Sequence, residues 1–383
     1  MENLNPRIAT LTLLRKELHK NPEVSGKEIN TASRIISFLE NYPPDAIKTK
    51  VGTTGILAIY KGKAAGKTVL FRCELDALPI EEINTFEHCS LIKGVSHKCG
   101  HDGHMAILCG LAIELHLKRP ETGTVILLFQ PAEEDGTGAT KVFNDFQFIY
   151  KPDFAFALHN IPGYKMNQIV VKNDTFSCAV NSLIIKLKGI TAHAGEPHKG
   201  INPALALAKI TTQFNQYIQA DISKKNYCLI TPIYSKMGKK AYGVSAGAAE
   251  IHFTVRSDSN LQMREIENSL EKLAKSIAQE LQLKCKTSWT QSFQANENNV
   301  QAVNHIKKAA GFNNFEILEK ETPFSWGEDF GLFTQHFPGA MFGLGSGTNT
   351  PALHNPDYDF PDEIIATGVH TFLQISKQIT DAH

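Results

Sequence analysis

The chain has 383 residues, of which 42% are hydrophobic, so it is long enough for a sizeable core and for two domains. Lys plus Arg and Asp plus Glu number 39 each, and the formal charge of zero favours neither a nucleic-acid partner nor an anionic membrane surface. The first residues lack the pattern of a signal peptide and no apolar run reaches the length of a membrane span, so we expect a cytoplasmic protein with no nucleic-acid or membrane partner.

Helix and strand patterns alternate through the first half of the chain. Amphipathic spacing predicts helices, and short apolar runs bounded by turn residues predict strands. The helices are expected at 8–20, 27–40 and 101–118, and the strands at 55–60, 68–74, 124–130 and 154–159. The helix at 101–118 carries one apolar face, made of Met105, Leu108, Leu111, Ala112 and Leu115. The alternation predicts an α/β sandwich with a sheet covered on both faces and functional groups at the strand ends.

From about residue 179 the organisation changes. The patterns here predict two long helices, at 202–220 and 260–281, and strands at 182–188, 227–233, 249–256 and 284–290. This segment shows no cluster of metal-binding side chains and has an ordinary size for a domain. We therefore expect a smaller α+β domain at 179–292, inserted into an α/β catalytic domain made of 1–178 and 293–383.

Seven cysteines are scattered along the chain, and their odd number and spacing predict no disulfide framework. Most of them are expected to be small buried residues. Cys99 is the exception because of its neighbours. The seven are Cys73, Cys89, Cys99, Cys109, Cys178, Cys228 and Cys285.

The segment from His97 to His104 packs a thiol, three imidazoles and a carboxylate into eight positions. Glycine at 100 lets the backbone approach closely, so Cys99 and His101 can reach the same ion. Thiolate and imidazole suit zinc, nickel or cobalt, and imidazole with carboxylate also admits manganese. Asp102 or a main-chain carbonyl is expected to orient one of the rings.

Two other interpretations of Cys99 stay open. A structural zinc site normally uses four clustered ligands, and the chain contains no Cys-x-x-Cys pair. A nucleophilic cysteine activated by His97 or His101 is the second alternative, although no Cys-His-Asn order of a cysteine protease accompanies it. If Cys99 binds metal, the remaining ligands come from distant parts of the sequence.

Three later segments supply such ligands. An apolar run at 127–129 leads through Gln130 and Pro131 into Glu133 and Glu134. Adjacent residues leaving a strand point in different directions, so one carboxylate can bind an ion while the other faces a water molecule. His159 and His354 each stand at or just beyond the end of an apolar run. Two solvated acids and two structural histidines are the alternative interpretation.

Taken together, six ordered motifs resemble the M20 metallopeptidase family, in the branch of amidohydrolases that includes hippurate hydrolase, N-acyl-amino-acid deacylases and auxin-conjugate hydrolases. They span nearly the whole chain, which makes the match specific. The motifs are His97-Lys98-Cys99-Gly100-His101-Asp102-Gly103-His104, Gln130-Pro131-Ala132-Glu133-Glu134, Leu158-His159-Asn160, Ala192-His193-Ala194-Gly195-Glu196-Pro197, Gly327-Glu328-Asp329-Phe330 and Leu353-His354-Asn355-Pro356.

The resemblance implies a site for two divalent ions per chain, of Zn, Mn, Ni or Co. Cys99 falls on the position that bridges the ions and Glu133 on the general base. The other ligand positions are expected to divide into one pair for each ion. His101 and His159 form the first pair, and Glu134 and His354 form the second.

The segment from Leu70 to Pro79 resembles the family's strand ending in Arg-Ala-Asp-x-Asp-Ala-Leu-Pro. Asp76 matches the catalytic-site acid behind the metals, which orients a ligand ring or tunes the site. Glu74 departs from the usual Asp by one methylene, and we expect this change to affect substrate contacts without abolishing activity.

In the inserted domain, the resemblance implies a lid or dimerisation role, and hence a possible homodimer. His193 matches a histidine that reaches the active site, often from the partner subunit, to stabilise an oxyanion or hold substrate. Arg256 is expected to bind a substrate carboxylate. Where relatives commonly carry Asn-x-Ile-Pro before the strand of this arginine, the chain reads Gly243-Val244-Ser245-Ala246. We therefore expect altered substrate selection.

The leading hypothesis is a metal-dependent amidohydrolase that removes an N-acyl group from an amino acid or a similar small amine. A di- or aminopeptidase on the same scaffold is the enzymatic alternative. A metal-bound protein that binds acylated amino acids without turnover is the alternative from another class, and the presence of Glu133 beside the ligands argues against it.

Overall fold

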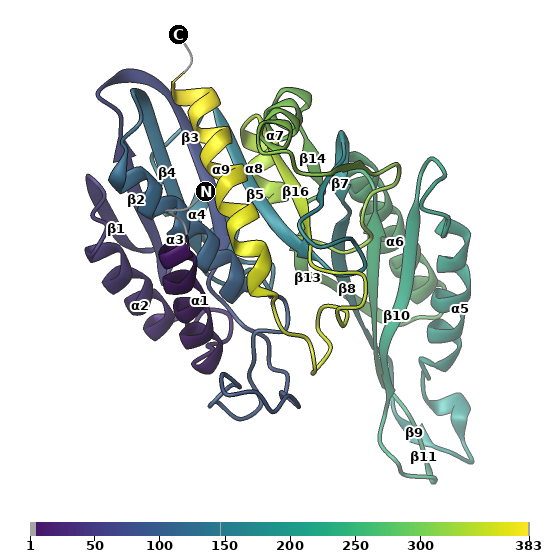
Figure 1. Cartoon of the computed structure of the whole chain (residues 1–383). Helices are drawn as coiled ribbons and strands as arrows, with labels where there is room; N and C mark the ends of the chain where they lie inside the picture. Colours follow the sequence, from purple (N-terminus) through teal and green to yellow (C-terminus); the bar gives the residue numbers. More distant parts are fainter. Residues whose placement is uncertain (1–4, 146, 382–383) are drawn as a thin grey trace. The chain divides into compact units, whose positions relative to one another are not determined.

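The protein was analysed as a computed structural model that describes residues 5–145 and 147–381. Its residues group into two compact units (Figure 1). The first unit takes the chain as far as Phe176, then Asn296–Glu321, and then the chain from Asp329 onward. The second unit consists of Ser177–Ala295 and Thr322–Glu328.

The first unit is built on an eight-stranded sheet with the order β1-β2-β4-β3-β5-β16-β6-β15. Neighbours among the four strands β4, β3, β5 and β16 are parallel, so their carboxyl ends lie at one edge of the sheet. β1 and β2 add an antiparallel hairpin on one side. The strands are β1 (Ala46–Val51), β2 (Gly55–Lys61), β3 (Ala64–Glu74), β4 (Thr122–Gln130), β5 (Phe154–Ile161), β6 (Ile169–Val171), β15 (Ile317–Glu319) and β16 (Gly339–Gly345).

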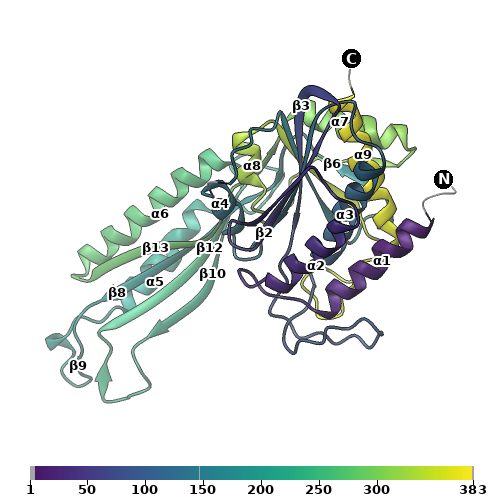
Figure 2. The same cartoon turned by 90° about the vertical axis from the view of Figure 1, so that its left-hand side faces the viewer.

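Helices cover both faces of this sheet, as Figure 2 shows. α1 (Asn5–Lys20), α2 (Ile29–Glu40), α3 (His101–Leu117), α7 (Val300–Phe312) and α9 (Ile365–Thr380) form the larger layer. α4 (Gly138–Phe143) and α8 (Gly331–His336) lie on the other face. The expected α/β architecture is confirmed. It follows from strands that are apolar on both sides, since each face then needs its own cover.

The larger layer closes over a single apolar core. Alternate residues of the strands, such as Phe71 and Phe156, pack against α3, α7 and α9. Their rings lie 5.8 Å apart, and the ring of Phe372 from α9 lies 4.8 Å from that of Phe71. Burial of this aromatic and aliphatic surface is the main force that holds helices and sheet together.

The helix at 101–118 differs from its expected one-sided pattern. α3 is buried along nearly its whole circumference, including His101, Asp102 and His104 in its first turn. It is enclosed by α1, α9 and the sheet, which explains why it carries two small residues at close contacts, Gly103 and Gly110. Its polar first turn is therefore a buried polar site inside the unit.

The second unit has its own sheet, with the antiparallel order β10-β12-β8-β13. Along β12, Ala249, Ile251, Phe253 and Val255 alternate with more exposed residues and face a separate core under α5 and α6. The elements are β8 (Ala179–Lys188), α5 (Ala204–Phe214), β10 (Cys228–Met237), β12 (Ala248–Ser257), α6 (Asn260–Glu280) and β13 (Lys284–Phe293). The expected helix at 202–220 is shorter, because the α-helix ends at Phe214 and one 3-10 turn follows it.

The segment Thr322–Glu328 also belongs to the second unit. The Cys178 amide donates to the Phe324 carbonyl (3.0 Å), and Arg256 donates from Nη1 to the Ser325 carbonyl (2.7 Å). These contacts join residues far apart in the sequence, which the local pattern does not indicate.

Shorter elements complete the fold. β7 pairs with β14, and β9 pairs with β11. All seven cysteines are free. Among residues 5–145 and 147–381, no helix is long and apolar enough to cross a membrane. The shorter elements are β7 (Asp174–Ser177), β9 (Ala192–His193), β11 (Val244–Ser245), β14 (Asn296–Asn298) and the 3-10 turns Pro197–Lys199, Asn215–Tyr217 and Asp362–Ile364.

The tight packing of α3 predicts opposite effects of one substitution at two helical glycines. A Cβ at Gly110 would lie 2.4 Å from Val369 Cγ2 and 2.8 Å from Leu11 Cδ1. Gly110→Ala is expected to lower the free energy of unfolding by about 1–3 kcal/mol through overpacking. A Cβ at Gly311 in α7 meets nothing within 4 Å. Gly311→Ala is expected to raise the free energy of unfolding by up to about 1 kcal/mol. Urea unfolding measures both, and a stabilised Gly110→Ala protein would contradict the packing described for α3.

Candidate metal centre

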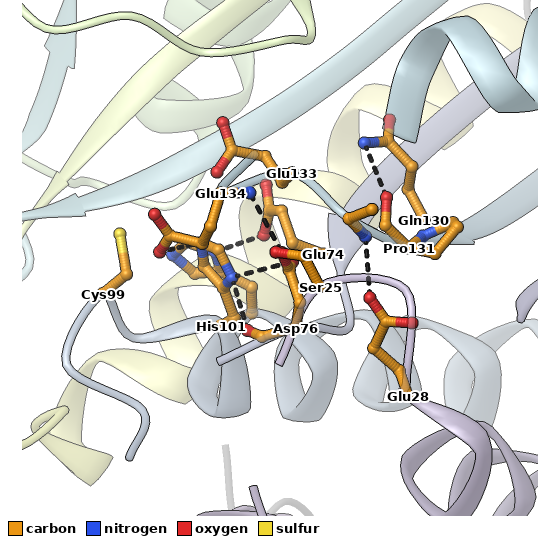
Figure 3. A network of polar contacts seen from close by, with 12 residues as sticks. Ser25, Glu28, Glu74, Asp76, Cys99, His101, Gln130, Pro131, Glu133 and Glu134 are labelled. Atoms are coloured by element: carbon orange, nitrogen blue, oxygen red, sulfur yellow. Dashed lines mark hydrogen bonds and ion pairs between the residues drawn. The ribbon is translucent and has the colours of Figure 1, made fainter. Parts of the chain in front are cut away.

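The candidate site lies at the edge of the sheet where the parallel strands end (Figure 3). Asp76 follows β3, Glu133 and Glu134 follow β4, and His159 lies near the end of β5. These four side chains come from the ends of three different strands. The strand order therefore brings together residues that are far apart in the sequence.

Two groups of possible metal ligands share one thiol. Cys99, His101 and His159 form one group, and Cys99, Glu134 and His354 form the other. Within each group, the ligand atoms lie within 4.8 Å of one another. All five residues belong to the first unit. Thiolate, imidazole and carboxylate at this spacing form a donor set that suits borderline-soft divalent ions.

The turn between Cys99 and His101 depends on the glycine between them. Gly100 has a φ of +94° and precedes the first residue of α3, so it occupies the left-handed region that favours glycine. A Cβ at this position would lie 2.6 Å from Oδ1 of Asn160 and 2.7 Å from its Nδ2. The backbone can therefore carry both ligands into the site only if residue 100 has no side chain.

Main-chain carbonyls orient the two buried histidine rings. His101 donates from Nδ1 to the Asp76 carbonyl (2.8 Å), and His159 donates from Nδ1 to the Asn160 carbonyl (2.9 Å). In the neutral form of each ring, the lone pair is then on Nε2. His159 Nε2 lies 3.4 Å from the Cys99 sulfur. His101 Nε2 is buried and has no hydrogen-bond partner among the residues described, which is the arrangement that a metal ligand requires.

Of the two expected orienting groups, the main-chain carbonyl is the one observed, because the carboxylate of Asp102 bonds to Nδ1 of His19 (2.8 Å). Asp76 takes that part through its carbonyl. Its carboxylate accepts hydrogen bonds from the Ser25 hydroxyl (2.7 Å) and from the amide of Glu134 (2.9 Å). Burial opposes ionisation of Asp76, but these bonds and His101 outweigh it and lower its pKa. Asp76 therefore ties α3 to the loop after β4.

Glu133 and Glu134 leave β4 through a sharp turn. Ala132 has a φ of +54°, and its amide donates to Glu28 (2.9 Å), a buried acid that the sequence analysis did not single out. Glu134 Oε1 lies 3.8 Å from His101 Nε2, and its Oε2 lies 3.7 Å from His354 Nε2.

The Glu133 side chain is buried, and its contact differs from those of Glu134. Its Oε1 accepts a hydrogen bond from the Asp329 amide (3.4 Å). The two neighbouring carboxylates thus have different surroundings, as Figure 3 shows.

The electrostatics of the site favour a cation. Burial alone would lower the pKa of His101, but the acids Asp76, Glu74 and Glu134 outweigh burial and raise it to about 10. Burial lowers the pKa of His159 well below its usual value, with a further lowering by His104. Without metal, the site therefore holds its positive charge as a proton on His101. The donor set and its charge fit a divalent ion in that place.

Glu74 lies behind this cluster. Its carboxylate accepts hydrogen bonds from Arg72 and from Nδ1 of His104 (2.6 Å), and all three residues are buried. Arg72 also donates to Asp329. Burial opposes ionisation of Glu74, but Arg72 and His104 outweigh it and lower its pKa well below the usual value.

His193 and Arg256 belong to the second unit. His193 is exposed on β9, and its strand pairs with Val244 and Ser245 of β11. The Ala194 amide adds a hydrogen bond to the Gly243 carbonyl (2.9 Å). The segment at 243–246 is therefore the hydrogen-bonded neighbour of His193.

Several residues of the site were quoted in motifs but given no role by the sequence analysis. His104 and Asn160 lie beside predicted ligands, and Asp329 lies in a quoted loop. Arg72 lies in the quoted segment from Leu70 to Pro79, and Glu28 carried no signal of its own. The signal for His104 and Asn160 is that each is a polar residue close in sequence to a predicted ligand.

Comparison with known proteins gives a family match over most of the chain. Residues 70–378 match the profile of Peptidase family M20/M25/M40. The N-acetyldiaminopimelate deacetylase of Halalkalibacterium halodurans is 30% identical over 363 residues, which cover 93% of this chain and 95% of that protein. The N-acetylcysteine deacetylase of Bacillus subtilis is 28% identical over 364 residues, which cover 95% of each chain.

A solved structure agrees in fold over the full length. The YXEP protein of Bacillus subtilis, described as a dinuclear metal binding peptidase from the M20 family, has a TM-score of 0.85 to this chain at 25% sequence identity. The match covers 99% of both chains. Both the sheet with its helical layers and the second unit therefore have counterparts in that structure.

The raised pKa of His101 predicts how metal uptake depends on pH. At neutral pH the metal-free protein holds a proton on this ring, whose pKa is about 10, and an ion that binds Nε2 must displace it. Affinity for Zn²⁺ is therefore expected to rise with pH and to fall as the solution becomes more acidic, with about one proton or more released per chain between pH 7 and 9. Calorimetry in buffers of different ionisation enthalpy counts the protons. Zinc binding with no proton release over this range would contradict a His101 ring that carries a proton at neutral pH.

Proposed function

The chain belongs to Peptidase family M20/M25/M40 and is a metal-dependent hydrolase of amide bonds, and on this premise we propose that it removes the acyl group from an N-acylated amino acid. The names of two relatives, each a deacetylase of an N-acetyl compound, support the substrate class. The single observation that carries the proposal is the cluster of thiol, imidazoles and carboxylates at the ends of the parallel strands.

We propose that this cluster holds two divalent ions per chain, of Zn, Mn, Ni or Co. Cys99 would bridge them, with His101 and His159 on one ion and Glu134 and His354 on the other. What supports this division is that the same two groups, sharing Cys99, meet the spacing needed for metal ligands. The dinuclear description of the Bacillus subtilis structure supports the count of two.

Glu133 is the proposed general base. Divalent ions bound in this site would polarise the amide carbonyl and lower the pKa of the attacking water. The Glu133 carboxylate would take the proton of that water and deliver it to the nitrogen of the leaving amine. The position of Glu133 supports this role, because Glu133 is buried at the same turn as Glu134 and accepts a hydrogen bond from the Asp329 amide. Asp76 would keep Glu134 and His101 in place.

His193 and Arg256 are proposed to act on the substrate. His193 would donate a hydrogen bond to the oxyanion that forms at the acyl carbon, and Arg256 would bind the carboxylate of the amino acid. The hydrogen bond from Arg256 to the Ser325 carbonyl fixes one end of the guanidinium, which supports a directed contact. The pairing of His193 with the segment at 243–246 makes that segment the proposed determinant of substrate choice.

A homodimer through the inserted domain is part of the proposal. β10 and β13 are the edge strands of its sheet, and an edge strand offers unpaired main-chain groups to a second copy. The proposed partners are thus the small acylated substrate and a second subunit, in the cytoplasm.

The proposal predicts metal-dependent activity. It also predicts that substitutions at two neighbouring glutamates separate the role of the base from that of the metal ligand. With added Mn, Zn, Ni or Co, the purified protein is expected to release amine from N-acyl amino acids, among them N-acetylcysteine and N-acetyldiaminopimelate. Glu133→Gln keeps the shape of the side chain but loses the base, so it is expected to retain metal while kcat falls by at least about a hundredfold. Glu134→Gln is expected to lose metal. Elemental analysis and steady-state kinetics measure both.

Each of these variants serves as the control for the other, since both remove one charge from the same turn. Equal loss of metal in the two variants would show that base and ligand are not divided in this way. A protein that binds metal and acylated amino acids but turns over none of them would instead be a binding protein.

A second prediction concerns the inserted domain. His193→Ala is expected to keep its metal content and fold while kcat falls by about a hundredfold or more, the effect of losing one oxyanion donor. His198→Ala removes another exposed imidazole of the same unit and is the matched control, with unchanged kcat.

Mixing His193→Ala with Glu133→Gln protein tests which subunit supplies the histidine. If it acts across a dimer, hybrid dimers regain one complete site and part of the activity. If it acts within its own chain, mixing restores none. Wild-type turnover by His193→Ala alone would refute the assigned role.

A further inference from the structure

Asn160 follows the ligand His159 in β5, is fully buried, and has no role in the proposed chemistry. Its side-chain amide accepts a hydrogen bond from Nε2 of His104 (2.6 Å) and donates from Nδ2 to the Tyr358 hydroxyl (2.5 Å). We propose that Asn160 is a positioning residue whose side-chain amide fixes the relative positions of the segments that carry the metal ligands. This inference rests on the ligand assignment of the proposed function and goes beyond it.

Asn160 contacts two ligand segments directly. Its own main-chain carbonyl accepts the hydrogen bond from Nδ1 of His159 (2.9 Å), which sets the tautomer of that ring. Its amide group lies against Gly100, so closely that a Cβ there would be 2.6 Å from Oδ1. Gly100 stands between Cys99 and His101. Asn160 therefore contacts the segments of three of the five proposed ligands, through its side-chain amide at Gly100 and through its main-chain carbonyl at His159.

Through Tyr358, the same amide reaches the segment of the fourth ligand. Tyr358 lies four residues after His354, and its carbonyl accepts a hydrogen bond from Nζ of the buried Lys98 (2.7 Å). The Lys98 carbonyl in turn accepts from the amide of His354 (2.7 Å). These bonds link the loop of His354 to the segment before Cys99, and the hydroxyl of Tyr358 links both to Asn160.

His104 connects Asn160 to the loop after β4. The ring bridges Asn160 and Glu74, and Glu74 accepts from Arg72. Arg72 also contacts Asp329, whose amide donates to Glu133. The contacts form one continuous buried chain from the proposed base to the ligand His159. Glu74 is the member that reaches both Arg72 and His104.

An amide suits this position because it offers a donor and an acceptor in one plane. Leucine has nearly the same shape but provides neither. The Tyr358 hydroxyl would lose its donor, and Nε2 of His104 would keep only the longer contact with the main-chain amide of residue 160 (3.3 Å). Loss of the amide is therefore expected to loosen several ligand segments together. A group that orients metal ligands from behind typically changes metal affinity by about ten- to a hundredfold when it is removed.

The test is metal affinity of the full-length protein, measured by titration with Zn²⁺ and Co²⁺ after chelator treatment. Asn160→Leu is expected to weaken binding by about tenfold or more. In the Co²⁺ protein, it is also expected to shift the charge-transfer absorption of the Cys99 thiolate. Neither readout requires turnover.

Asn298→Leu is the matched control. Asn298 is another buried asparagine of the first unit, and its amide also makes hydrogen bonds on both sides, to main-chain atoms of Met341 (2.8 Å) and Lys172 (2.9 Å). It contacts none of the ligand segments in those bonds. We expect this variant to lose stability while its metal affinity and Co²⁺ spectrum stay as in the wild type. Equal losses of affinity in both variants would overturn the proposal.

Tyr358→Phe provides a second test that removes one oxygen atom and is the milder change to the fold. It is expected to weaken metal binding by severalfold. Combined with Asn160→Leu, it is expected to add little, because both changes remove the same contact. Unchanged affinity in Tyr358→Phe, or in a folded Asn160→Leu protein, would overturn the proposal. A wild-type protein that binds neither ion would instead refute the metal site itself, and the positioning role with it.

Discussion

The contacts of Asp76 are the constraint on which the rest of the site depends. Through one residue, the end of β3 holds the first turn of α3 by the bond from His101 and holds the loop after β4 by the bond from the Glu134 amide. The bond from His101 is buried and the bond from the Glu134 amide is partly buried, so water competes little for them. The orientation of the His101 ring and the position of Glu134 are thus set by the same residue, Asp76.

Much of the polar interior has a geometrical role. Arg72, Glu74, His104 and Asp329 form a buried ionic network, and such networks contribute little net stability because of the cost of desolvation. The network instead fixes the relative positions of the segments that carry these residues, since its ion pairs form only when the segments are correctly placed. Stability comes instead from the apolar layer of α3, α7 and α9 on the sheet. Positioning and stability are therefore supplied by different parts of the same unit.

The proposed substrate-contact residues belong to the second unit, and the candidate metal ligands belong to the first. Its fold rests on its own core, and His193 is exposed at a short pair of strands away from that core. Changes at 243–246 therefore alter the neighbour of His193 without touching a buried ligand.

The sequence by itself determined the element types, the α/β class and the ligand types, because periodicity and residue chemistry are properties of neighbouring residues. It indicated Cys99 with His101, the pair Glu133 and Glu134, and histidines at two strand ends. Only the tertiary structure decided which groups meet. It showed that Asp76, and not Asp102, orients His101, and that α3 is enclosed on nearly all sides. It also placed Asn160 between Gly100, His104 and Tyr358, because such contacts depend on strand order and packing across more than fifty residues of chain, which no local pattern encodes.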